Sequence, residues 1–521
     1  MTKIAVTMAQ SMSYITELND IRGGDGAGGS DPRTGVTARI VEIFESAIAA
    51  GELAPGTKLP PTRRLAEQAG VNHLTAARAY KQLAERGLVT SKVGSGTFVR
   101  STAPTAATSD ARVPDSIAWQ RYALPEDRES YGDRVLGQIL TDVGTEGLIP
   151  MSVGYPSEAT FPIDELRDAT AAVMRDEPER ALQYSDVSGE RELAEQLAAL
   201  SAERDAPEDA EDIVITTGAT QGLSISMRAI LSPGDIVACE DPSFMSVIRA
   251  ISGSGARVKP VPVDEDGLDV DALEALLARE EVRALAIQPR IHNPTGRDLI
   301  PERRARLLEL ARRHGFFIVE DGIYGDLRLE PGVARSLRAD APANVIYVDS
   351  LSKTVGGGLR IGWIAASGPV LDRIVSEKRS DDMHTPTLTQ LAVARYLATG
   401  AYPAQVERAI AHHRRGRDVL IESVDEHLGP IATYPTPLGG GHLWVTLDSP
   451  VSEQELVDEA RRQGVAFTPG GAMRIDRSPD LSVRLSYSYL GAEDLREGVR
   501  RLAAALRTVR RRPARRAAAP L

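Results

Sequence analysis

The residues with the clearest chemical potential surround Lys353. This lysine ends the segment Ser350-Leu351-Ser352-Lys353, and Arg360 follows seven residues later. A lysine amine forms a Schiff base with a carbonyl carbon, and the neighbouring hydroxyls and guanidinium can hold a phosphate group. An isolated lysine is usually a surface charge. The flanking Ser350, Ser352 and Arg360 are therefore what favours a chemical role.

Further residues complete one kind of cofactor site. Asp321 can keep a ring nitrogen protonated, and Phe244 can stack on a ring. Gly218, Ala219 and Thr220 precede an expected helix whose N-terminal amides can hold a phosphate. With Lys353 these groups meet the requirements of a pyridoxal phosphate site. Taken singly, Asp321 would be better explained as a helix N-cap, and Phe244 as a core residue.

Two polar groups extend the set. The tetrapeptide Asn293-Pro294-Thr295-Gly296 and Tyr324 place an amide and a hydroxyl where both can bond the phenolic oxygen of the cofactor. As a bare tetrapeptide, the first of these is only a turn. The sequence predicts no metal site.

The elements that position these residues alternate between apolar strands and amphipathic helices. Helices such as 221–231 and 301–314 lie between several of the strands. We expect the strands near residues 212–217, 235–239, 257–262, 283–288, 316–320, 345–349 and 359–365. This alternation predicts an α/β domain with a mostly parallel sheet, in which sites form at the carboxyl ends of the strands. The candidate residues fall at those ends.

A second pattern precedes this domain. Ile40, Ile43, Phe44 and Ile48 have helical spacing, helices are expected at 62–69 and 73–86, and residues 88–99 predict a hairpin. Asn72 is the expected N-cap of the 73–86 helix. The geometry is a helix-turn-helix with a wing, in which the last helix enters the major groove of DNA. The candidate DNA contacts are Arg63, Arg64, Asn72, His73, Thr75, Arg78, Gly94, Ser95, Gly96 and Thr97.

Charge is segregated along the 521 residues. The net charge is −12, but residues 1–35 carry −1, residues 36–100 carry +4 and residues 507–521 carry +6, so that residues 101–506 carry −21. An acidic body repels nucleic acid except near these two basic segments. We expect a disordered tail (1–35), a DNA-binding domain (36–100), a linker (101–148), a cofactor domain (149–506) and a basic tail (507–521).

Composition constrains the location of the protein. No apolar run approaches the roughly 20 residues that span a bilayer, and no secretion signal is visible at the N-terminus. The single cysteine, Cys239, lies in a strand-like run and is expected to be buried packing. These features predict a cytoplasmic protein without a membrane partner.

Two resemblances fit these patterns. Residues 36–100 resemble the GntR-type winged helix, including the Gly94-x-Gly96-Thr97-Phe98-Val99 wing, although Pro61 and His73 depart from the usual residues. The Ser-x-Ser-Lys, Arg360 and Asn-Pro-Thr-Gly motifs resemble the fold type I aminotransferases, with Phe244 in place of the more usual Tyr and Gly322-Ile323 after Asp321. Together they resemble the MocR/GabR subfamily of transcription regulators.

The resemblance implies further features. The fold would be a mostly parallel seven-stranded sheet with a small C-terminal subdomain, assembled as a head-to-tail homodimer. Tyr184 would reach the phosphate site of the neighbouring subunit, Arg484 would clamp a carboxylate, and Tyr155 would lie beside the effector. The effector would be an amino acid or related amine that alters binding to a double-stranded DNA operator.

Other functions fit part of the pattern. An aminotransferase with a non-functional head is the main alternative, because the cofactor site is complete and turnover remains open. A head that serves only in dimerisation is a second alternative. A structural DNA-binding dimer with an inactive body is disfavoured, since Lys353, Asp321 and Asn293 are all present.

Overall fold

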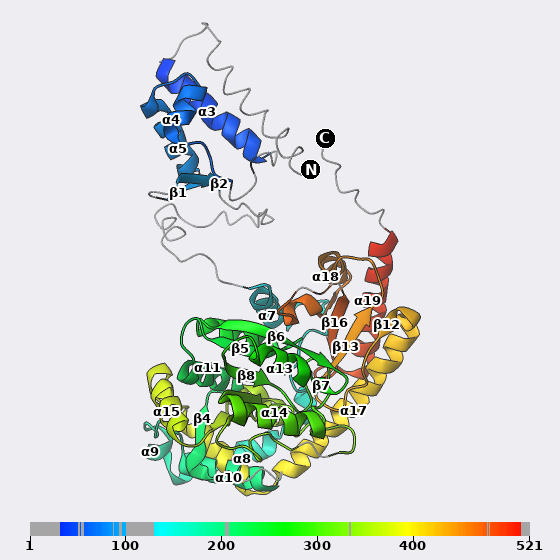
Figure 1. The fold of residues 1–521 in the computed structure, drawn as a ribbon. Helices are drawn as coiled ribbons and strands as arrows, with labels where there is room; N and C mark the ends of the chain where they lie inside the picture. Colours follow the sequence, from blue (N-terminus) through cyan, green and yellow to red (C-terminus); the bar gives the residue numbers. More distant parts are fainter. Residues whose placement is uncertain are drawn as a thin grey trace. The chain divides into compact units, whose positions relative to one another are not determined.

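The computed structural model describes residues 32–49, 53, 57–86, 88–92, 96–99, 130–203, 208–332, 335–476, 478 and 480–511. The chain divides into two compact units, Met1–Asp127 and Arg128–Leu521, which are described separately (Figure 1). Gly94, Ser95 and most of the two expected tails lie outside the described residues. Within the described part of the chain, no helix is long and apolar enough to cross a membrane.

The first unit contains the expected helix-turn-helix and wing. Its elements are α3 (Pro32–Ala49), α4 (Thr62–Gln68), α5 (His73–Glu85), β1 (Val89–Lys92) and β2 (Gly96–Val99). The two strands pair antiparallel, with Lys92 opposite Gly96. Ile40, Phe44, Leu65 and Leu83 are completely buried and form the centre of the core. The helices that the apolar spacing predicts are therefore present, packed on one shared core.

Helix α3 begins earlier than expected. Residues 32–35, which the sequence analysis assigned to a disordered tail, form the first turn of this helix. Pro32 occupies the first helical position, where its missing N–H removes no helical hydrogen bond. The Gly-rich stretch before it masked this start in the sequence.

The body is built on an eight-stranded mixed sheet. The strand order is β4-β11-β10-β9-β8-β5-β6-β7, and β11 runs antiparallel to both of its neighbours. The strands are β4 (Ile213–Thr216), β5 (Ile236–Asp241), β6 (Arg257–Asp264), β7 (Gly267–Leu268), β8 (Val282–Ile287), β9 (Phe317–Asp321), β10 (Val345–Ser350) and β11 (Gly362–Ala365). Seven of these match the expected strands. The eighth, β7, has only two residues, which is too short for a periodic signal.

Helices cover both faces of the sheet. α13 (Val270–Leu277) and α14 (Pro301–His314) pack with one set of alternating strand residues, and α11 (Ala219–Ile230), α12 (Met245–Gly253) and α15 (Pro369–Asp381) pack with the other. Further helices around the sheet are α8 (Ile163–Asp176), α9 (Pro178–Ala181), α10 (Arg191–Glu203) and α16 (Thr387–Ala398). Cys239 is completely buried within this core, which confirms its expected packing role.

A smaller C-terminal layer completes the body. Helix α17 (Tyr402–His427) leads to an antiparallel sheet in the order β12-β13-β16-β15, which α18 (Glu453–Arg462) and α19 (Ala492–Arg511) accompany. The strands are β12 (Ala432–Thr433), β13 (His442–Leu447), β15 (Thr468–Pro469) and β16 (Leu481–Ser486), while β14 (Val465–Ala466) pairs with β3 (Ile149–Pro150). Helix α19 extends to Arg511, into the stretch expected to be a tail, because Val509 continues the buried stripe of Leu502 and Leu506.

The expected linker contains a helix. Residues 131–142, inside the 101–148 range, form α7 (Tyr131–Asp142), and residues 101–129 lie outside the described residues. Ser130 and Asp133 form a capping box at its start. An ion pair of 2.7 Å joins Asp133 to Arg249 of α12, and Ile139 is buried. This segment therefore belongs to the body.

Candidate functional site

A cavity of about 670 Å³ lies in the body where β4, β9 and β10 end. Residues that follow these strands line it on one side, and residues of the C-terminal layer line it on the other. Helix α7 contributes a third wall. Parallel strands present their carboxyl ends at one edge of a sheet, which is why residues distant in sequence meet here.

Lys353 faces this cavity from η5 (Ser352–Gly356), the short π-helical turn that follows β10. Its side chain is half-buried, and Nζ donates a hydrogen bond of 2.7 Å to the carbonyl oxygen of Gly154. Burial lowers the pKa of the Lys353 amine to about 8, with Arg484 acting in the same direction and Asp321 opposing it. A larger fraction of the amine is therefore uncharged and nucleophilic near neutral pH than in an exposed lysine.

Asp321 ends β9 and lies 5% exposed at the base of the cavity. Its Oδ1 accepts a hydrogen bond from the backbone N–H of Ile323. Burial raises the pKa of this carboxyl to about 7, and the nearby Asp349 raises it further while Lys353 lowers it. A buried carboxylate of this kind gains strongly from a cationic partner.

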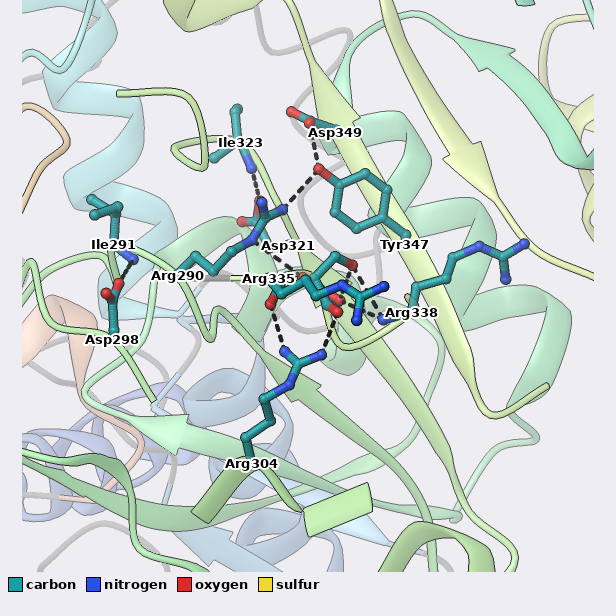
Figure 2. A network of polar contacts seen from close by, with 12 residues as sticks. Arg290, Ile291, Asp298, Arg304, Asp321, Ile323, Arg335, Arg338, Tyr347 and Asp349 are labelled. Atoms are coloured by element: carbon teal, nitrogen blue, oxygen red, sulfur yellow. Dashed lines mark hydrogen bonds and ion pairs between the residues drawn. The ribbon is translucent and has the colours of Figure 1, made fainter. Parts of the chain in front are cut away.

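A polar network lies behind Asp321 (Figure 2). The Tyr347 hydroxyl donates to Oδ2 of Asp349 at 2.6 Å, and Arg290 donates to the Tyr347 oxygen at 3.0 Å. A side chain at Gly322 would collide with the Tyr347 ring, since a Cβ there would lie 2.3 Å from it. The glycine after Asp321, noted in the sequence as a departure, thus leaves room for this tyrosine.

A cradle for an anion forms at the start of α11. Gly218 has a φ of +86°, and a Cβ at this position would lie 2.6 Å from Nη2 of Arg360. Ala219, Thr220, Ser352 and Arg360 all line the cavity at this point. The free backbone N–H groups of a helix N-terminus together with a guanidinium suit a phosphate dianion.

Ser350 does not line the cavity. Its hydroxyl donates to the carbonyl oxygen of Ile361 at 2.8 Å and shares a hydrogen bond of 2.7 Å with the Ser352 hydroxyl. As the last residue of β10, it faces the neighbouring chain segment instead of the cavity. The Ser350 hydroxyl thus holds Ser352, and the expected phosphate contact of Ser350 stays a prediction.

Arg484 on β16 is 2% exposed and lines the cavity. It donates hydrogen bonds of 3.1 Å to Oδ1 of Asn293 and to Thr468, and its Nε has no partner. Burial lowers the pKa of its guanidinium to about 10, which leaves it charged at neutral pH. Among the described residues, Arg484 forms no ion pair with a carboxylate.

Tyr324 and His442 form a buried pair at the same wall. The Tyr324 hydroxyl lies 2.9 Å from Nε2 of His442, whose Nδ1 has no partner. Burial raises the pKa of the tyrosine and depresses the pKa of the histidine well below its ordinary value, so both are neutral. A buried N–H without a partner costs more free energy than a ring nitrogen lone pair without one. This favours the His442 tautomer that donates from Nε2 to the Tyr324 oxygen. The tyrosine proton is then free to face the cavity.

The remaining expected residues are distributed differently. Phe244 and Tyr155 line the cavity, and Tyr155 stands edge-on to Tyr489 with ring centroids 6.3 Å apart. Tyr184 is 77% exposed and does not line the cavity of its own chain; its ring contacts His384. Exposure of this kind is compatible with a contact to a second subunit.

In the first unit, the exposed candidates lie on two helices. Arg63 and Arg64 are exposed on α4, and His73 and Arg78 are exposed on α5. The expected contacts Asn72 and Thr75 have another use, because Oδ1 of Asn72 accepts from both the backbone N–H and the hydroxyl of Thr75.

In the wing, backbone groups make the contacts to the rest of the domain. The Thr97 carbonyl oxygen accepts from the backbone N–H of Leu59 at 2.8 Å, and Gly96 pairs with Lys92. The side chain of Thr97 is half-buried. Gly94 and Ser95 lie outside the described residues.

Sequence analysis missed several residues that line the cavity. His442 and Ser152 carry no recognisable motif. The apolar residues of α7 had a detectable signal, because a Ser-x-x-Asp cap precedes leucine and isoleucine at helical spacing. The missed residues include Leu136, Ile139, Leu140, Val143, Ser152, Gly154, Phe161, Leu223, Met245, His442 and Tyr489.

The fold and this set of charged groups define an aminotransferase-like body preceded by a winged helix-turn-helix. Residues 146–502 match the family of class I and II aminotransferases, and residues 36–99 match the bacterial regulatory proteins of the gntR family. The chain therefore belongs to the aminotransferase class I and II family. It carries an N-terminal GntR domain, in the arrangement typical of MocR/GabR-type regulators.

Individual relatives include both enzymes and regulators. A 2-aminoadipate transaminase of Thermus thermophilus is 34% identical over 366 residues, which cover 69% of this chain and 90% of the relative. An uncharacterized HTH-type transcriptional regulator of Bacillus subtilis, YisV, is 28% identical and covers 91% of this chain and 96% of its own.

Solved structures agree with the fold. The crystal structure of LysN, an alpha-aminoadipate aminotransferase from Thermus thermophilus complexed with N-(5'-phosphopyridoxyl)-L-leucine, superposes with a TM-score of 0.68. It is 31% identical and covers 75% of this chain and 98% of that chain. The Thermus thermophilus transaminase and LysN cover 69% and 75% of this chain, whereas YisV covers 91% of it.

Proposed function

We propose that this protein is a transcription regulator that binds DNA through residues 36–100 and senses an amino acid in the cavity of its body. The GntR domain supports the first part. The second part depends on a set of charged side chains that line one cavity without an ion pair among the described residues: Lys353, Asp321, Arg360 and Arg484. Asp321 and Arg484 are buried, and buried charges are costly without partners, so this set fits a ligand with complementary charges.

The residues present fit pyridoxal phosphate. The cradle at Gly218 and Arg360 suits its phosphate, the buried carboxylate of Asp321 suits its ring nitrogen, and Lys353 suits its aldehyde. Phe244 lines the same space and offers a ring face, while Tyr324 and Asn293 offer donors for the phenolic oxygen. When bound, this cofactor supplies an aldehyde that reacts reversibly with primary amines.

The chain's own residues define what the effector must carry. Arg484 binds a carboxylate, because its Nε is buried without a partner and its other nitrogens are fixed by Asn293, Thr468 and Ser152. The Lys353 amine, with its lowered pKa, accepts or releases a proton near neutral pH. An effector with one primary amine and one carboxylate satisfies both groups.

The regulator would act as a homodimer in the cytoplasm. Tyr184 is exposed, as a residue that reaches the phosphate site of a second subunit must be in a single chain. The effector would change DNA affinity if it binds two conformations of the dimer with different affinities. Such a coupling free energy typically amounts to about 1–3 kcal/mol.

A direct experiment starts with DNA selected from random duplexes by the purified, cofactor-loaded protein. The affinity for the selected duplex is then measured with and without amino acids, in parallel with a protein that lacks residues 1–127. We expect tight binding only with the GntR domain present and a shift in affinity with at least one amino acid. Failure of the full chain to enrich any duplex would contradict the proposal.

Catalysis is the second candidate, because the same charged groups would serve a transaminase. The observation that favours it is the complete set of Lys353, Asp321 and Arg484 around one cavity. Steady-state formation of a new amino acid from an amino acid and a 2-oxo acid would establish turnover. A single stoichiometric change of the cofactor spectrum would leave sensing as the function.

A further inference from the structure

The cavity extends beyond the charged groups to an apolar wall on α7. Leu136, Ile139 and Leu140 line the cavity from one face of the helix, and Val143, the residue that follows the helix, lines it as well. Ile139 is 6% exposed, whereas Leu140 is 59% exposed. Exposed leucine on the wall of a cavity gains free energy when an apolar group covers it.

Further apolar residues line the same space. Phe161, Leu223 and Met245 line the cavity, and the last two are each 3% exposed. Outside the four charged groups of the site, the only charged residue that lines the cavity within the described part of the chain is Glu158, which is exposed. Solvent screens a charge in that position, so it contributes little to recognition.

The wall is held in place at both ends of α7. Near its start, the Tyr131 hydroxyl donates to Glu453 at 3.1 Å, and Asp133 pairs with Arg249 at 2.7 Å. At its end, the buried Asp142 accepts from Ser152 at 3.0 Å and pairs with Arg461 at 2.7 Å. Because α12, α18 and the segment after β3 all contact it, the apolar face is preformed.

We propose that the effector is an α-amino acid with a large, uncharged, apolar side chain, which packs against Leu136 and Leu140 of α7. This inference depends on the proposed sensing function. With the carboxylate at Arg484 and the amine at Lys353, the side chain is the part of the effector that remains to fill the apolar space. A charged side chain would lose its hydration there without gaining a partner.

The same helix links recognition to the rest of the chain. α7 is the first described element after the segment that follows the GntR domain, so the effector's side chain would touch the part of the body joined covalently to the DNA-binding unit. A change at this wall should alter selectivity among amino acids more than cofactor binding.

The test compares amino acids on the cofactor-loaded protein. The concentrations of alanine, 2-aminobutyrate, norvaline, leucine, phenylalanine, glutamate and lysine that half-saturate the change in cofactor absorbance are measured. We expect each added buried methylene to tighten binding about fourfold, with leucine and phenylalanine far ahead of glutamate and lysine. Equal potency of alanine and leucine, or a clear preference for lysine or glutamate, would overturn the inference.

Variants locate the effect. Leu140→Glu should weaken leucine at least tenfold and reverse part of the discrimination against lysine, and Leu136→Ala should weaken leucine by a smaller factor. Gly137→Glu is the matched control, since Gly137 is exposed on α7, does not line the cavity, and a Cβ there would meet no atom within 4 Å. It should bind leucine as the parent protein does. Unchanged leucine affinity in both leucine variants would show that α7 is not the side-chain wall.

The outcome separates two kinds of failure. If no amino acid alters cofactor absorbance or DNA affinity, the sensing function itself is wrong. If amino acids act and Arg484→Ala weakens them all, but side-chain length has no effect, sensing stands and only the apolar class is wrong. Thermal melting of Leu140→Glu checks its fold; the exposure of this position predicts little change.

Discussion

The two domains use charge in opposite ways. In the GntR domain, Arg63, Arg64 and Arg78 are exposed on short helices, where a solvated guanidinium costs little until DNA arrives. In the body, Arg484 and Asp321 are buried and held by neutral partners, so a charge on either costs free energy. The first arrangement suits an extended polyanion, and the second suits one small molecule of fixed charge pattern.

The largest expected effect concerns the covalent chemistry of the body. Lys353→Ala should abolish the borohydride-fixed attachment of pyridoxal phosphate, because Lys353 is the lysine at the strand end facing the cavity. Peptide mass spectrometry after reduction measures this. Lys259→Ala, which removes a surface lysine paired with Glu280, should keep the attachment. A reduced wild-type protein labelled on another lysine would show that the site is misassigned.

The buried guanidinium should matter next. Arg484→Ala should weaken effector binding by about 2–5 kcal/mol, since it removes one member of a buried charge pair. The loss should be visible in both the spectral and the DNA response. Arg484→Lys should recover only part, because an ammonium lacks the planar fork. An amine without a carboxylate should bind equally weakly to the wild type and to Arg484→Ala. If such an amine binds the wild type tightly, Arg484 does not hold the effector's carboxylate.

The exposed arginines should each contribute less. Arg63→Ala and Arg78→Ala should each weaken binding to the selected duplex by about 1–3 kcal/mol, and a phosphate contact should also reduce the salt dependence. Gel-shift titration at several salt concentrations measures both. Arg312→Ala, an exposed arginine on α14 of the body, is the control. Unchanged affinity in both head variants would contradict the assigned orientation of the helices.

The remaining two predictions concern pH. Burial lowers the pKa of the Lys353 amine to about 8, so its uncharged fraction, and with it the rate of cofactor uptake by the apo protein, should rise roughly tenfold from pH 6 to pH 7 and level off above pH 8. Stopped-flow absorbance records this. A rate that keeps rising towards pH 10 would indicate a lysine with an ordinary pKa.

The buried carboxyl of Asp321, which would pair with the ring nitrogen of the cofactor, should also affect the free energy of unfolding. The pKa of Asp321 in the folded apo protein is about 7, above its value of 3.8 in an unfolded chain, so the folded state binds more protons between these values. Stability relative to Asp321→Asn should therefore fall as pH rises from about 4 to 7, by at most about 1.4 kcal/mol per pH unit. Chemical denaturation of both proteins at several pH values measures the difference.

The predictable part of the molecule was the part encoded locally. Strand and helix periodicity identified seven of the eight strands of the sheet, and the short motifs placed Lys353, Asp321 and Gly218 at strand ends. The direction of an individual side chain was harder. Ser350 and Ser352 belong to one motif, yet only Ser352 lines the cavity, because β10 ends between them.

What sequence missed was set by tertiary contacts. Residues 131–142 were assigned to a linker since they adjoin a small, polar stretch, but ion pairs to α12 and α18 fix them on the body as α7. His442 became a candidate only when β13 placed it 2.9 Å from Tyr324. Both features depend on partners more than 100 residues away, which no local pattern reveals.

The proposed function requires that one chain couples amine chemistry at Lys353 to DNA affinity. The most direct test follows cofactor absorbance and fluorescence anisotropy of the labelled duplex in the same sample during a titration with leucine. Coupling predicts that both signals change with one midpoint, and that in Arg484→Ala both midpoints move together. A spectral change that is complete while DNA affinity stays constant would contradict coupling and leave an aminotransferase joined to an independent DNA-binding domain.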